Sequence, residues 1–121
     1  MPDARFLLVT TPQPVAQTVA VRAADLAAQF GLEVLGVVEN MAAFTPPQGG
    51  PAVAIFGSGG GEQLAAELRV PLLASVPLDA SLRAGADEGR PLVLRDDAGA
   101  AASAIVAAAR ALAAAHQGEA P

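Results

Sequence analysis

The chain of 121 residues contains no cysteine, no lysine, no tryptophan and no tyrosine, and it has one histidine. Without cysteine, it cannot form disulfides, use a thiolate as a catalyst, or ligate zinc or an iron–sulfur cluster through its own sulfur. The net charge is −5, and the seven basic residues, all arginines, are scattered along the chain. Because nucleic acids and anionic membranes bind basic patches, we expect neither as a partner.

Long apolar runs are absent too. No unbroken stretch of about 18 apolar residues could cross a membrane, and the amino terminus lacks the pattern of a signal peptide, so a cytoplasmic protein is favoured. Of the residues, 53% are hydrophobic, but four phenylalanines are the only aromatics. A core of Val, Leu, Ile and Ala suits strands buried on both faces of a parallel sheet. We expect a single α/β domain over residues 1–116 and a flexible tail over residues 117–121.

Apolar runs predict three buried strands, over residues 5–10, 33–38 and 72–76. Helical patterns cover residues 15–30, 62–68 and 80–86, a last helix ends near residue 115, and residues 92–94 read as extended. A strand, a helix and a strand of these lengths form a right-handed unit with parallel strands. In the first helix Val15, Val19, Leu26 and Phe30 fall near one face, together with Arg22. The fold class is therefore α/β, with a parallel sheet flanked by helices.

Candidate binding residues follow the predicted strands at their carboxyl ends, where open α/β sheets bind ligands. Asn40 follows the second strand, and its amide can both donate and accept, as an adenine edge requires. An asparagine there is equally well explained as a turn residue that bonds its own backbone. Pro77 and Asp79 follow the third strand and offer a rigid apolar wall and an acceptor for a ribose hydroxyl. Taken alone, Asp79 is better explained as the cap of the next helix.

A glycine-rich loop, GSGGG at residues 57–61, leads into the second helix and is a candidate cradle for an anion. It is not a Walker A loop, because Gly61 is followed by Glu62 instead of lysine and serine or threonine. Glu62 would also repel a phosphate. We therefore favour the interpretation that these glycines allow a tight turn and the close approach of another segment.

Catalytic and metal-binding residues are not predicted. His116 lies near the end of an alanine-rich helix without a second ligand nearby, and it has no nucleophile to activate. The adjacent acid pairs Asp87-Glu88 and Asp96-Asp97 fall in turns and caps and point in different directions. A small hydrolase or transferase is therefore disfavoured.

The order of five motifs resembles one ATPase family over nearly the whole chain. The motifs are VTTPQ at residues 9–13, GVVENM at 36–41, FGSGGG at 56–61, VPLD at 76–79 and GRPLV at 89–93. Together they are similar to the carboxyl-terminal half of Mrp/ApbC-type P-loop ATPases, which are described as iron–sulfur cluster carriers. These ATPases belong to the group that includes MinD and the nitrogenase iron protein. The resemblance implies the corresponding half of a MinD-like P-loop fold, and a dimer.

The resemblance also implies ATP as the cofactor. Asn40 matches the asparagine that faces the adenine, and Pro77 and Asp79 match the residues that flank the base and the ribose. The half of the family's fold that bears the lysine loop and the magnesium-binding aspartates has no counterpart in this sequence. Phosphoryl transfer depends on those groups, so we expect no hydrolysis by this chain alone. Many members carry Cys-x-x-Cys shortly after the ENM motif, where this sequence reads AFTPPQ at residues 43–48. No iron–sulfur cluster is therefore expected through cysteine.

The sequence is compatible with two alternative functions. In the first, the chain is part of an Mrp-like ATP-binding protein of iron–sulfur cluster assembly, as a fragment or a natural truncation, and it contributes the adenine and ribose side of the site. In the second, the chain is a non-enzymatic interaction module that uses its bare sheet edge to form a homo-oligomer or to pair with an intact ATPase.

Overall fold

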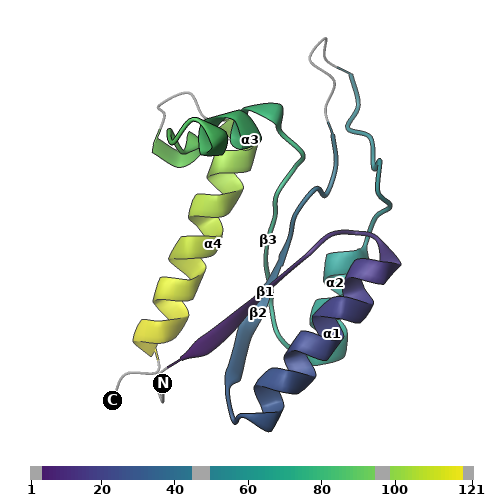
Figure 1. Ribbon diagram of the computed structural model, residues 1–121, viewed down its shortest axis with the longest axis vertical. Helices are drawn as coiled ribbons and strands as arrows, with labels where there is room; N and C mark the ends of the chain where they lie inside the picture. Colours follow the sequence, from purple (N-terminus) through teal and green to yellow (C-terminus); the bar gives the residue numbers. More distant parts are fainter. Residues whose placement is uncertain (1–3, 45–49, 95–98, 119–121) are drawn as a thin grey trace.

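A three-stranded parallel sheet organises the protein. The computed structural model describes residues 4–44, 50–94 and 99–118. Strands β1 (Arg5–Thr10), β2 (Glu33–Glu39) and β3 (Leu72–Ser75) lie in the order β1-β2-β3, and both strand pairs are parallel. The three carboxyl ends therefore meet at one edge of the sheet, at the top of Figure 1. The predicted α/β fold with a parallel sheet is confirmed.

Helices cover both faces of this sheet (Figure 1). Helices α1 (Pro14–Gln29) and α2 (Gly60–Leu68) pack on one face, and α4 (Gly99–Gly118) packs on the other, mainly against β3. Helix α3 (Ala80–Asp87) lies near the start of α4, at the carboxyl edge of the sheet. The boundary between a domain of residues 1–116 and a tail stays a prediction, because residues 119–121 lie outside the described part.

Residues 92–94 differ from the sequence prediction. They form a short 3₁₀ helix, Leu92–Leu94, instead of an extended segment. The Leu94 amide donates to the Pro91 carbonyl at 3.0 Å, which closes the turn. The turn directs Leu92 inward, where it is buried in the cluster beneath α4. Burial of one leucine therefore decides the local conformation, a tertiary effect that a three-residue apolar run does not reveal.

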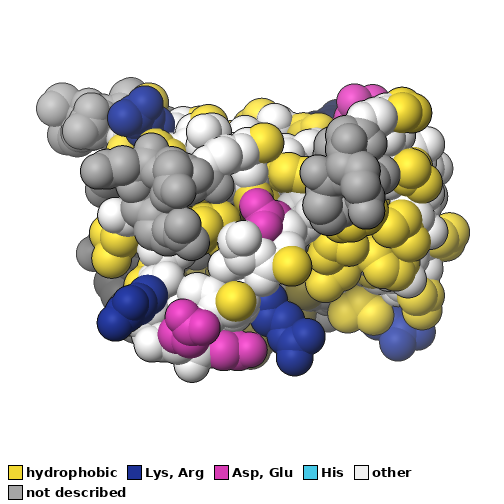
Figure 2. Space-filling model, turned by 90° about the horizontal axis from the view of Figure 1, so that it is seen from above, with side chains coloured by type: hydrophobic (Ala, Val, Ile, Leu, Met, Phe, Trp, Pro, Cys, Tyr) yellow, Lys and Arg dark blue, Asp and Glu magenta, His cyan; other side chains and the backbone are white. Residues whose placement is uncertain are grey.

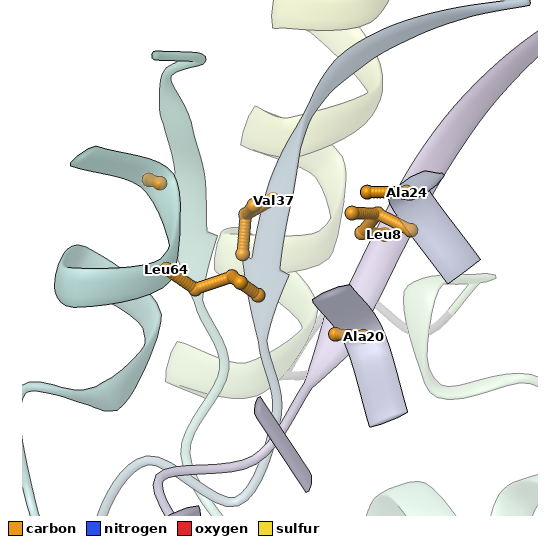
Figure 3. Close-up of a cluster of buried hydrophobic side chains, with 6 residues drawn as sticks. Leu8, Ala20, Ala24, Val37 and Leu64 are labelled. Atoms are coloured by element: carbon orange, nitrogen blue, oxygen red, sulfur yellow. The ribbon is translucent and has the colours of Figure 1, made fainter. Parts of the chain in front are cut away.

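The core consists of two clusters, one on each face of the sheet. Figure 3 shows the first cluster, in which Leu8 of β1, Val37 of β2 and Leu64 of α2 meet between the sheet and the helices. Val37 and Leu64 have no exposed surface. The second cluster joins Val38 and Val76 to side chains of α4 and to Leu92. Neighbouring residues of β2 thus serve opposite faces, as expected for a strand covered on both sides.

Alanine builds the buried face of α1. Ala20, Ala24 and Ala27 face the sheet, and their small side chains let the helix approach it closely. The large apolar side chains that share one face of this helix are exposed instead: Val15 by 71%, Val19 by 63%, Leu26 by 51% and Phe30 by 72%. The face defined by large residues in the sequence is therefore the outer flank of α1.

Candidate functional site

Backbone hydrogen bonds join the segments that follow β2 and β3 at the carboxyl edge of the sheet. The Val76 amide donates to the Glu39 carbonyl at 2.7 Å, and the Ala42 amide donates to the Val76 carbonyl at 3.0 Å. The Leu78 amide in turn donates to the Ala43 carbonyl at 2.7 Å. The two segments therefore run side by side beyond the strands. We call the surface formed by residues 40–44 and 76–81 the rim.

Asn40 lies at the start of the rim, directly after β2. Its backbone amide donates to the Thr10 carbonyl at 2.7 Å, which ties it to the end of β1. Its side-chain Oδ1 accepts from the Met41 amide at 2.9 Å, in a turn where Met41 takes a left-handed φ of 54°. This is the local bond expected of a turn residue. Among the described residues, no acceptor engages the side-chain NH₂ of Asn40.

Pro77 and Asp79 lie on the same rim and line a cavity of about 310 Å³ that also touches the start of α4. A second cavity, of about 430 Å³, adjoins it and is lined by Asp79 and residues of α3. Asn40 lines neither cavity, so the structure brings Pro77 and Asp79 together and sets Asn40 beside them along the rim. Figure 2 looks down on this edge of the molecule, where apolar and uncharged groups surround an acidic side chain near the centre, and further acidic and basic side chains lie toward the margins.

Asp79 caps helix α3, as the sequence favours. Its Oδ1 accepts from the Ser81 amide at 2.8 Å. The residue itself is partly exposed and borders both rim cavities. A carboxylate has two oxygens and about four acceptor positions, so capping one amide leaves capacity for a ligand hydroxyl. The cap and the ribose contact are therefore compatible.

The glycine loop binds a carboxylate of the protein's own chain. The Oε2 of Glu39, a residue only 7% exposed, accepts from the Gly61 amide at 2.6 Å in the first turn of α2. A helix amino terminus favours negative charge, and here the strand end supplies it. A Cβ on Gly61 would lie 2.7 Å from the Glu39 Cβ, and a Cβ on Gly60 would lie 2.7 Å from the Pro12 carbonyl oxygen. The glycines thus serve close packing, and this amide is not free for a phosphate.

Two residues of this region were not predicted from the sequence as part of the site. Phe44 lines both rim cavities beside Asp79 and offers an aromatic surface for a flat ring. Its amide and carbonyl exchange hydrogen bonds with those of Val53, at 2.8 and 2.7 Å, and these fix its place. One sequence feature could have indicated a role for Phe44 in the site: it is one of four aromatic residues and closely follows the ENM motif. Glu39 is the second residue, and its contact with the Gly61 amide joins positions 22 residues apart, which no local motif indicates.

Metal ligands do not gather at the rim. In the described ranges, no three His, Asp or Glu side chains lie close enough together to hold a metal ion. The side chain of His116 and residues 45–49, where many members of the resembling family carry cysteines, lie outside the described part. Of the helices within it, none is long and apolar enough to span a bilayer.

Comparison with known protein families shows which family the chain belongs to. A family model described as "ParA: NUBPL iron-transfer P-loop NTPase" matches residues 1–113. The chain belongs to this family. The NUBPL-type chain is also 45% identical over 114 residues to an iron–sulfur cluster carrier protein of Synechocystis. That alignment covers 93% of this chain but 32% of the relative, so the chain spans about a third of the length of such curated relatives.

Solved structures of other proteins support the same family assignment. The MinD cell division ATPase of Pyrococcus furiosus superposes with a TM-score of 0.67 at 28% identity, over 90% of this chain and 42% of that one. A nucleotide-binding protein of Archaeoglobus fulgidus, solved with ADP, superposes with a TM-score of 0.63 at 34% identity. That match covers 76% of the NUBPL-type chain and 38% of its neighbour. The fold is thus part of a MinD-like P-loop NTPase, as the five motifs predict.

Proposed function

We propose that this chain supplies the base and ribose side of the nucleotide site of an iron–sulfur cluster carrier. The observation that carries the proposal is the rim, where Asn40, Pro77 and Asp79 lie along hydrogen-bonded segments at the carboxyl edge of a parallel sheet. The Asn40 NH₂ would donate to the adenine, Pro77 and Phe44 would provide its apolar wall, and Asp79 would accept from the ribose. The cytoplasmic location predicted from the sequence remains part of this proposal.

Phosphate binding and cluster transfer require groups that this chain does not contain. The chain has no lysine, and the Gly61 amide already binds Glu39, so the described residues suit a nucleoside better than its phosphates. A cluster, as cargo, would need ligands other than cysteine of this chain. We therefore propose that hydrolysis of ATP and transfer of a cluster depend on residues outside these 121.

Isothermal titration calorimetry of the purified chain with adenosine and with ADP tests this function. Because the contacts are to base and ribose, the two ligands should bind with similar Kd, about millimolar or tighter, which corresponds to about 4 kcal/mol or more. Asn40→Ala removes the free donor and should weaken both by about tenfold. Gln63→Ala, which removes an exposed amide from α2, is the matched control and should change neither Kd.

Three outcomes would contradict the proposal. One is an Asn40→Ala variant that binds as well as the unchanged chain. Another is ADP that binds far more tightly than adenosine, because that would reveal a phosphate site within the chain. The third is no heat from either ligand at millimolar concentration. That last result would favour the second function, a non-enzymatic interaction module, which is supported by the edge of β1 that has no strand partner among the described residues.

A further inference from the structure

Glu39 is a buried acidic residue that the proposed nucleoside site does not use. It is the last residue of β2 and directly precedes Asn40, and only 7% of its surface is exposed. It lines neither of the two rim cavities. Glutamate is almost never buried to this extent unless its carboxylate is paired. The burial of Glu39 beside a candidate binding residue therefore needs a physical account.

Three contacts hold Glu39 at the end of β2. In the parallel pairing with β1 it lies opposite Thr10. Its carbonyl accepts from the Val76 amide at 2.7 Å, which ties it to the segment that follows β3. Its Oε2 accepts from the Gly61 amide at 2.6 Å, which ties it to the first turn of α2. A hydrogen bond to a carboxylate is shorter and stronger than a neutral one, so the side-chain contact adds a firm third anchor.

Asn40 depends on this anchor because the chain leaves the sheet directly after Glu39. The Asn40 Oδ1 accepts from the Met41 amide at 2.9 Å, in a turn where Met41 takes a left-handed φ of 54°. A residue other than glycine keeps that conformation only where the surrounding structure determines it. Backbone bonds to the ends of the neighbouring strands support the turn, and the Glu39 carboxylate fixes the residue from which it starts.

We propose that Glu39 is a positioning residue, whose bond to the Gly61 amide holds the Asn40 carboxamide in the orientation in which it meets a base. This inference rests on the nucleoside site proposed above. Glu39 lies outside both rim cavities, so it acts by restricting Asn40 before the ligand arrives. Preorganisation of this kind raises affinity, because less conformational freedom is lost on binding. The glycine loop thus serves the site indirectly, through a contact that spans 22 residues.

A simple cap of α2 is the alternative role for Glu39, since a helix amino terminus favours a negative charge. A cap would stabilise the fold and leave the affinity for a nucleoside unchanged. A positioning residue changes that affinity, and it does so through Asn40. Measuring adenosine affinity and unfolding in the same set of variants therefore separates the two roles.

Calorimetric titration of adenosine into variants of the intact chain tests the positioning role. Glu39→Ala should raise the Kd by about fivefold, less than the loss expected of Asn40→Ala, because the donor remains but is no longer held. In an Asn40→Ala background, Glu39→Ala should have no further effect on the Kd, since the group it positions is gone. Glu39→Gln keeps an oxygen acceptor for the Gly61 amide and should recover most of the affinity.

Gly61→Ala tests the same link from the side of α2. The added Cβ would lie 2.7 Å from the Glu39 Cβ and 3.0 Å from its Oε2, and its three nearest atoms all belong to Glu39. Displacing the carboxylate in this way should raise the adenosine Kd about as much as Glu39→Ala. Leu64→Ala is the control for lost stability, because it truncates a core residue of the same helix. It should leave the Kd of the folded chain unchanged, and circular dichroism checks that each variant is folded.

Hydrogen exchange at the Met41 amide reports on Asn40 without a ligand, because this amide donates to the Asn40 Oδ1. An exposed turn exchanges by local opening, so Glu39→Ala should speed its exchange by about tenfold and Leu64→Ala should not. Faster exchange with no adenosine binding by the unchanged chain would uphold the effect on Asn40 and reject the nucleoside site. Unchanged exchange in Glu39→Ala, or losses of affinity in Glu39→Ala and Asn40→Ala that simply add, would overturn the positioning role.

Discussion

Gly61→Ala should lower the free energy of unfolding by about 2 kcal/mol, although alanine is normally the better helix residue. A Cβ at this position would lie 2.7 Å from the Glu39 Cβ and 3.0 Å from its Oε2. Overpacking of this kind costs about 1–3 kcal/mol, and displacing the carboxylate from the Gly61 amide also weakens a buried charge-assisted hydrogen bond. The gain in helix propensity, up to about 1 kcal/mol, offsets part of that loss. Urea unfolding followed by circular dichroism measures the difference.

A double-mutant cycle assigns the effect to Glu39. The three atoms nearest to the added Cβ all belong to that side chain, so the penalty should largely disappear in a Glu39→Gly background. Glu62→Ala, at the exposed neighbouring position, is the control and should change stability by no more than about 0.5 kcal/mol. An equal loss in both backgrounds would show that the glycine loop is not held by this contact.

Leu64→Ala should destabilise the protein by about 3 kcal/mol, the largest loss that we expect from a single truncation. Leu64 has no exposed surface and fills the space between α2 and the sheet (Figure 3). Removing its buried carbons forfeits their transfer free energy and leaves a cavity, which together cost about 2–5 kcal/mol in well-packed cores. Thermal and urea unfolding of the variant measure the loss.

Leu94→Ala is the matched control, because it removes the same atoms from a leucine that is 78% exposed. Its effect should stay within about 0.5 kcal/mol. Similar losses for the two variants would contradict the assignment of Leu64 to the centre of the core, because exposed and buried truncations would then be equivalent.

The strands and their direction are predictable from the sequence for a simple reason. Each is a short apolar run bounded by Pro, Gly or polar residues, and a crossover helix between the first two fixes a parallel pair. The helix faces are harder to predict. In α1 the large side chains form the most visible stripe, yet the sheet takes the alanines because only small side chains permit close packing. Residue size thus misleads when a helix lies tightly on a sheet.

Part of the candidate site was predictable as well. Asn40, Pro77 and Asp79 follow strands of a parallel sheet, so their meeting at one edge follows from topology. Phe44 joins the cavity only through its pairing with Val53, nine residues along the chain, which local sequence does not encode. The contact between Glu39 and Gly61 spans 22 residues and depends on how α2 packs on β2. The parts of the site that could not be predicted from the sequence are therefore the contacts between distant segments.

The central claim, that the rim is the base and ribose side of a nucleotide site, is tested most directly by NMR titration of the isotope-labelled chain with ADP. Amide shifts should change along the rim, at Asn40, Ala42, Leu78 and Asp79, and adenosine should produce the same pattern. Changes centred on Gly59, Gly60 and Gly61, or a rim that does not respond to either ligand, would contradict the account.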